Sequence, residues 1–152
     1  MMPATIAPSI EAMQAITDRI NSGTAYELDL KATYSEQLVD PLEEIVGLRV
    51  DVCSESEEQL IETCDLEDNT RHIIRVWIRK KLQAITPDEI DPLKLLCRQI
   101  FQRLNNFRSS NGRVMVFDIE NDVKPVPDKT ALHTSRLFVA SVYLVVEVEP
   151  SP

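Results

Sequence analysis

Glycine and histidine are scarce in this chain of 152 residues, which contains three glycines and two histidines. Gly23, Gly47 and Gly112 stand far apart, so the sequence has no glycine-rich loop of the kind that cradles phosphates. His72 and His133 belong to no spaced set of histidines and cysteines. The sequence therefore predicts no nucleotide cofactor, no metal centre and no recognisable catalytic constellation.

Cysteine is also scarce, and its spacing argues against a disulfide framework. The three cysteines, Cys53, Cys64 and Cys97, are odd in number and form no C-x-x-C pair. This usage fits a reducing compartment, so we expect synthesis in a cytoplasm. Cys97 falls on the apolar side of a predicted helix, where we expect a small packed side chain and not a reactive thiol.

Long apolar runs are missing, and cations are outnumbered by acids. No window reaches the roughly 18 consecutive apolar residues that a membrane-spanning helix needs. The first residues lack the basic flank and the apolar stretch of a secretory signal, which we therefore do not expect. Sixteen Lys and Arg stand against 25 Asp and Glu, for a formal net charge of −9. Such a surface is poorly suited to gripping phosphates, so general nucleic-acid binding is disfavoured.

What the chain does contain is the composition of an ordinary folded protein. Hydrophobic residues make up 43% and charged residues 27%, which is close to average usage in globular proteins. The length is enough for one core of ordinary size and leaves no room for a second. We therefore expect residues 1–152 to form a single domain.

Two segments have the apolar spacing of three and four that predicts an amphipathic helix. The first covers residues 9–21, and the second extends from about residue 86 to residue 107. Thr86-Pro87 and Asp91-Pro92 both resemble a helix start, so the sequence leaves the first residue of the second helix open. This longer helix should cover one face of a sheet.

Alternation of apolar and polar residues predicts strands in five places. They are residues 26–34, 48–53, 70–82, 114–119 and 135–149, with a polar connector at residues 121–133. Because helices and strands do not alternate regularly, an antiparallel or mixed sheet with helices on one side is favoured. The predicted fold is α+β, with a mixed or antiparallel sheet of about five strands and two amphipathic helices.

Charge is distributed unevenly between two neighbouring segments. Residues 54–69 contain seven acidic residues and no Lys or Arg, and we expect a solvated loop or hairpin tip there. The acidic residues are Glu55, Glu57, Glu58, Glu62, Asp65, Glu67 and Asp68. The strand that follows carries a cationic set with one tryptophan, which we interpret as a candidate protein interface. This set is Arg71, Arg75, Trp77, Arg79, Lys80 and Lys81.

Trp77 is the least expected residue of that strand. It shares a face with Arg75 and Arg79, opposite Ile74 and Ile78, whose side chains should already fill the core. Trp and Arg are common interface anchors, which favours a contact with another protein. If the N-terminal helix covered this face, Trp77 would instead be an ordinary core residue.

The order and texture of these segments resemble the tail-terminator proteins of long-tailed bacteriophages. Three segments carry the resemblance: the basic strand RHIIRVWIRKKL at residues 71–82, the helix DPLKLLCRQIFQRL at residues 91–104, and the last strand RLFVASVYLVVEVE at residues 136–149. The resemblance covers about residues 9–149, and residues 24–40 depart most from the family's pattern.

The resemblance implies a structural virion protein of the tail-neck region, assembled in the host cytoplasm, and not an enzyme. Copies of such a protein form a ring, expected to be a hexamer, on the last ring of tail-tube protein. The ring ends tube polymerisation and offers a docking surface to a head-completion or connector protein. We expect it to close through sheet edges and through pairing of the acidic and basic segments.

In such a ring, DNA passes through the centre without tight binding, which suits an acidic protein because like charges repel. The acidic residues of 54–69 are therefore candidates for lining the channel or its rim. Two alternatives remain at this point. One is another neck protein, such as a head-completion or connector-adaptor protein, and the other is a small acidic cytoplasmic enzyme or regulatory subunit.

Overall fold

The computed structural model describes residues 6–22, 26, 28–35, 47–59, 70–121 and 126–149, with the backbone alone for residues 57–59. The elements in chain order are α1 (Pro8–Asn21), β1 (Ala32–Ser35), β2 (Leu48–Gln59), β3 (Thr70–Lys81), α2 (Pro87–Leu104), β4 (Val114–Asn121), α3 (Lys129–Ser135) and β5 (Leu137–Val148).

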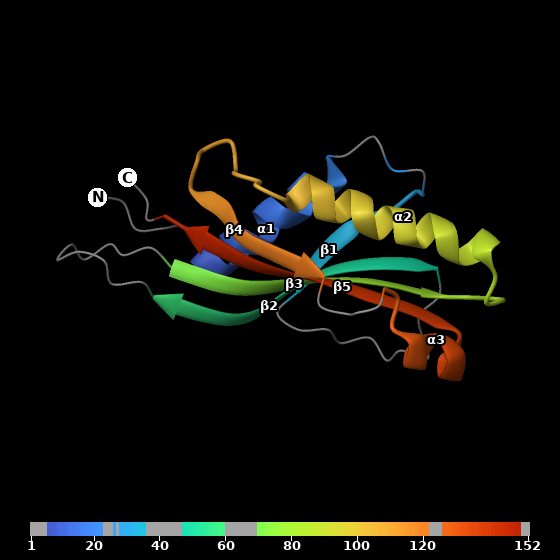
Figure 1. Cartoon of the computed structure of the whole chain (residues 1–152). Coiled ribbons are helices and arrows are strands. Elements are labelled where there is room, and N and C mark those ends of the chain that lie inside the picture. The colour runs from blue at the N-terminus through green and yellow to red at the C-terminus, as the bar shows by residue number, and fades with distance from the viewer. Residues whose placement is uncertain are drawn as a thin grey trace.

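The five strands form one mixed sheet in the order β1-β2-β3-β5-β4 (Figure 1). β1 is parallel to β2, whereas the pairs β2–β3, β3–β5 and β4–β5 are antiparallel. β3 and β5 pair along their whole length, from Thr70 opposite Val148 to Lys81 opposite Leu137. This arrangement confirms the predicted α+β class and the mixed sheet of five strands.

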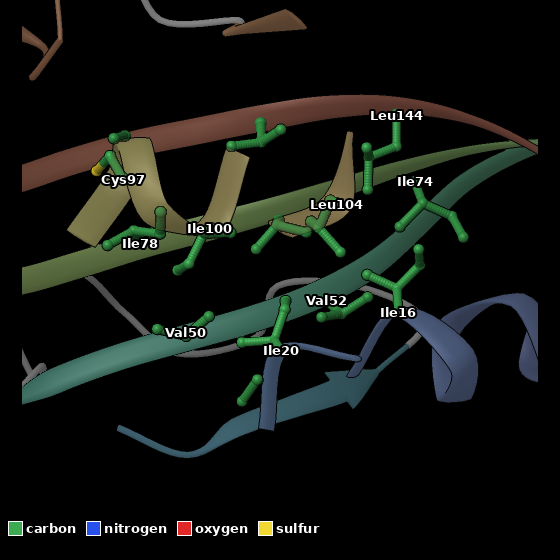
Figure 2. Packing of buried hydrophobic residues seen from close by; sticks show 14 of the residues in the cluster. Ile16, Ile20, Val50, Val52, Ile74, Ile78, Cys97, Ile100, Leu104 and Leu144 are labelled. Carbon is green, nitrogen blue, oxygen red and sulfur yellow. The ribbon is translucent and has the colours of Figure 1, made fainter. Parts of the chain in front are cut away.

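Helices α1 and α2 lie on the same side of the sheet (Figure 1). Because side chains alternate along a strand, every second residue of β2, β3 and β5 points toward these helices. The buried side chains that meet there include Ile16 and Ile20 of α1, Val50 and Val52 of β2, Ile74 and Ile78 of β3, Ile100 and Leu104 of α2, and Leu144 of β5 (Figure 2). We call this the helix-covered face, and it contains the main hydrophobic core.

The two predicted helices are present, and the structure decides the start of the second one. α2 begins at Pro87 and continues through Pro92. Pro87 stands at the first helical position, where its missing N–H costs nothing. Pro92 is inside the helix and has no N–H to bond to the carbonyl of Asp88. The helix therefore includes both of the segments that resemble a start.

A third helix, α3, corrects the predicted polar connector at residues 121–133. The Asp128 side chain accepts hydrogen bonds from the backbone N–H groups of Thr130 and Ala131 and so caps this helix. The pairing of β4 with β5 ends at Asn121 and Val142. α3 packs on β5, in the part of that strand that β4 does not pair with. With one buried apolar residue, Leu132, in seven, the helix is too short for an apolar repeat to reveal it.

Two strand predictions also need correction. The alternating segment at residues 26–34 is a strand only from Ala32 onward, where its backbone begins to pair with β2. Tyr26, Leu28 and Leu30 pack against the core without joining the sheet. In contrast, β2 extends well past residue 53, because residues 54–59 stay paired with β3 through an irregularity between Ser54 and Ser56.

Candidate protein-interaction surface

The side of the sheet opposite α1 and α2 is called here the second face. β3 contributes Arg71, Ile73, Arg75, Trp77 and Arg79 to it. Their neighbours Ile74, Val76 and Ile78 are fully buried in the core, as the alternation in the sequence predicts. α1 packs on the helix-covered face, so the interpretation in which the N-terminal helix covers Trp77 is wrong.

Three arginines on β3 each reach an acid on a neighbouring strand. Arg71 Nη2 lies 2.8 Å from Glu147 Oε1 on β5, and Arg75 Nη1 lies 2.7 Å from Glu55 Oε1 on β2. Arg79 Nη2 lies 2.9 Å from Asp51 Oδ2, also on β2. The spacing of four residues keeps the arginines on one face, and the sheet places an acid beside each of them.

Two of these arginines also stack on aromatic rings. The Arg71 guanidinium lies 5.0 Å from the centre of the Phe117 ring. That of Arg75 lies 5.6 Å from the ring of Trp77 and 5.7 Å from that of Tyr143. Stacking and ion pairing together hold both guanidinium groups in place. Arg71, Arg75, Trp77, Phe117 and Tyr143 thus form one cluster, which we call the aromatic–arginine cluster.

Phe117 is the most exposed member of the aromatic–arginine cluster, with 58% of its surface accessible. It lies on β4 where the pairing with β5 shifts between Val116 and Asp118. Val114 and Val116 are buried in the core, so alternation along the strand directs Phe117 to the second face. A large apolar ring exposed beside paired arginines is a feature typical of interface anchors.

Arg79 does not belong to the exposed part of the second face. Its side chain is fully buried, and Asp51 is nearly so, at 8% exposure. Asp51 also accepts a hydrogen bond from Thr33 Oγ1 at 3.3 Å and lies 3.5 Å from Arg49 Nη2. The sequence suggested an interface role for Arg79, but the strand register gives it an acidic partner inside the subunit.

The lysines at the end of β3 do not join the aromatic–arginine cluster either. Lys80 lies opposite Phe138 of β5, and Phe138 is buried in the main core. Lys80 therefore belongs to the helix-covered face and not to the second face. Lys81 is exposed, and its Nζ donates a hydrogen bond to the backbone oxygen of Ser135, 2.6 Å away. The structure thus brings together Arg71, Arg75 and Trp77 from the predicted interface set.

The predicted acidic residues fall into two groups. Glu55 lies on the second face beside Arg75, and Glu57 and Glu58 lie on β2 opposite His72 and Arg71. Glu62, Asp65, Glu67 and Asp68 lie outside the described residues. The prediction of a loop or hairpin tip is therefore wrong for residues 54–59, because continued pairing with β3 outweighs their polar composition.

Several members of the second face were not singled out from the sequence. Tyr143 and Glu147 alternate with apolar residues in the last strand, a signal that could have placed them opposite the core. Phe117 also follows alternation, because Val114 and Val116 of its strand are buried, but its place beside Arg71 depends on the strand order. Asp51 could not be matched with Arg79 before the register of β2 and β3 was known.

The remaining chemistry-bearing groups within the described ranges are structural. His72 is buried, and its Nε2 lies 2.8 Å from Thr70 Oγ1. Burial raises the pKa of the Cys97 thiol to about 12, which keeps it protonated. The described residues hold no group of three or more potential metal ligands. Among the helices described, none is long and apolar enough to span a membrane.

Comparison with known proteins adds no relative. No protein-family model matches the chain, and no curated protein matches it significantly. The functional argument therefore depends on the fold and on the second face.

Proposed function

We propose that the protein is a structural virion protein that forms a ring at the head-proximal end of a bacteriophage tail tube. There it ends tube polymerisation and joins the tail to the head connector. The α+β sheet with its two long amphipathic helices is compatible with the fold that the tail-terminator resemblance implies. The observation that carries the proposal is the aromatic–arginine cluster on the second face.

The aromatic–arginine cluster is well prepared for contact with another protein. Arg71 and Arg75 already have acidic partners, so burying them in an interface would leave no isolated charge. Their stacking on Phe117, Trp77 and Tyr143 reduces the side-chain freedom that binding would remove. We therefore assign the cluster to contact with an adjacent subunit or with the tail-tube protein.

The direct test is assembly of the purified protein, alone and on tail tubes. We expect a closed ring of discrete mass by native mass spectrometry, and tubes of defined length that carry the ring at one end by electron microscopy. Phe117→Asp should weaken assembly by about tenfold or more. It should not lower the melting temperature, because the phenyl group of Phe117 is largely exposed to solvent in the isolated subunit.

Tyr34→Asp is the matched control, since Tyr34 is an exposed aromatic residue of β1 at 42% exposure. It should assemble as the wild type does. A chain that stays monomeric both at high concentration and in the presence of tail tubes would refute the proposal. Binding between the tube and the head without an effect on tube length would instead identify another neck protein, such as a connector adaptor.

A further inference from the structure

Helix α2 borders two hollows that meet at Lys94. The larger, of about 410 Å³, is lined by Cys97, Arg98 and Phe101 of α2 and by Val126. The smaller, of about 240 Å³, is lined by Ile90 of α2 and by Leu132 of α3. The α2 residues recur at three and four, so they lie along one side of the helix. We call these joined hollows the α2 groove.

The α2 groove combines an apolar floor with a cationic rim. Phe101, Ile90 and Leu132 supply apolar surface. The exposed charged residues around it are three cations and one acid: Lys94, Arg98, Lys129 and Asp91. Among the described residues, neither Lys94 nor Arg98 has an acidic partner, in contrast to the paired arginines of β3. In a chain with a net charge of −9, such a rim is suited to an acidic segment that also carries apolar side chains.

The chain itself contains such a segment. Residues 60–68 have the sequence LIETCDLED, in which Leu60, Ile61 and Leu66 accompany four acids. We propose that the α2 groove of one copy binds residues 60–68 of a neighbouring copy. This inference rests on the proposed self-assembly and identifies one of its contacts.

A copy's own segment is too far away to occupy the groove. Residues 60–69 connect Gln59 to Thr70, so they can project past the strand ends by about 18 Å at most. Asn121, which lines the larger hollow, pairs with Val142, and Val142 pairs with Val76 on β3. Val76 is about 20 Å along β3 from Thr70. The occupant must therefore come from another molecule.

The other ways of closing a ring through charged segments are less favourable. The β3 arginines already form ion pairs within the chain, so an acidic segment of another copy would have to compete with those acids. The outer strand β4 carries Asp118 and Glu120, and the part of β2 that extends past β1 carries Glu55 and Glu57, so pairing these two edges would bring acids together. Such like-charge contacts across strands are destabilising. The α2 groove offers the acidic segment opposite charge instead.

Charge reversal on each side provides the test. Lys94→Glu with Arg98→Glu should raise the apparent dissociation constant for self-association about tenfold or more, measured by sedimentation equilibrium. Glu62→Lys with Asp65→Lys should weaken it similarly. A chain carrying all four changes should recover most of the wild-type affinity. Lys31→Glu with Arg108→Glu is the control, since it changes the net charge equally at exposed cations outside the groove.

Crosslinking supplies a second readout that does not depend on affinity. Gln102 is an exposed residue of the groove, so in the Gln102→Cys variant a bismaleimide should join the introduced thiol to Cys64 of another copy. The Ser110→Cys variant, exposed outside the groove, should give no such product. Self-association that neither charge reversal weakens, or the absence of the crosslink in assembled rings, overturns the inference and leaves the proposed function standing. Wild-type protein that never self-associates refutes the proposed function itself.

Discussion

Arg79 and Asp51 form a buried ion pair whose value to the fold depends on both partners being present. Within the part of the chain that the structure describes, the Nε and Nη1 atoms of Arg79 are buried without a hydrogen-bond partner, and Asp51 is the acid paired with its Nη2 atom. Taking a charge out of water costs several kcal/mol, and an unpaired charge recovers little of this. Removing one partner of this pair should therefore lower the free energy of unfolding, because the other charge stays buried without compensation.

We predict that Asp51→Ala lowers the free energy of unfolding by about 3–5 kcal/mol, because it leaves Arg79 charged and buried. The double variant Asp51→Val, Arg79→Leu should cost less than Asp51→Ala alone. Urea denaturation measures both. Glu55→Ala is the control, because it breaks the more exposed pair with Arg75 and should cost about 0–1 kcal/mol. Equal costs for Asp51→Ala and Glu55→Ala would contradict this interpretation.

Cys97 couples stability to alkaline pH. Burial raises the pKa of its thiol from 9.0 to about 12, so the unfolded chain releases the proton first as pH rises. Its contribution to stability is complete below about pH 9 and is lost between about pH 9 and pH 12. At about pH 11 the loss should be roughly 2–3 kcal/mol.

We therefore predict that the free energy of unfolding falls more steeply with pH in the wild type than in Cys97→Ala. Urea denaturation at about pH 8 and about pH 11 gives the two slopes. Ile100→Val is the control, because it removes buried volume one helical turn away and keeps the thiol. Parallel slopes for wild type and Cys97→Ala would show that the thiol does not titrate as burial requires.

At the scale of elements, α3 depends on one cap. The seven residues of α3 are too few to be stable as an isolated helix. The Asp128 carboxylate accepts hydrogen bonds from two of its first backbone N–H groups, and Ala131 packs against Leu137 and Val139. Trp77 packs against the same two residues and is the single tryptophan of the chain. The state of α3 should therefore be visible in tryptophan fluorescence.

We predict that Asp128→Ala destabilises the protein by about 1 kcal/mol and shifts the emission of Trp77 to longer wavelength, because a frayed α3 admits water near the ring. Fluorescence spectra and thermal melts measure the two effects. Lys129→Ala serves as control, because it lies in the same helix and leaves the cap intact. An unchanged emission maximum in Asp128→Ala would mean that α3 does not shield Trp77.

At the scale of the whole molecule, the charge balance determines which large partners are favourable. The net charge of −9 means that acids outnumber cations, and the three arginines of β3 are paired with acids. Tight binding to duplex DNA depends on neutralising several phosphates together. A ring of such subunits would therefore let DNA pass without holding it.

We predict that the isolated protein does not bind duplex DNA with submicromolar affinity at physiological salt, because acids outnumber its cations and the arginines of β3 are paired with acids. Fluorescence anisotropy with a labelled duplex measures this. A variant with Glu55→Gln and Glu147→Gln, which removes two acidic charges beside Arg75 and Arg71, should bind more tightly than the wild type. Strong salt-dependent binding by the wild-type chain would contradict a DNA channel of neutral or acidic character.

Much of the architecture could be predicted because it follows from local periodicity. The repeats of three and four identified α1 and α2, and strict alternation identified the core face of β3 and β5. The candidate surface was predicted only in part. Arg71, Arg75 and Trp77 follow from alternation in one strand, whereas the contact of Phe117 with Arg71 depends on the strand order and α3 depends on a cap.

The sequence by itself determined the α+β class, the composition of the core and the side of β3 that carries Arg75 and Trp77, because these depend on neighbours along the chain. Only the tertiary structure decided that Arg79 is buried beside Asp51 while Phe117 is exposed beside Arg71. The reason is strand register: which side chains meet across a sheet depends on residues far apart in sequence, and alternation alone does not encode that distance.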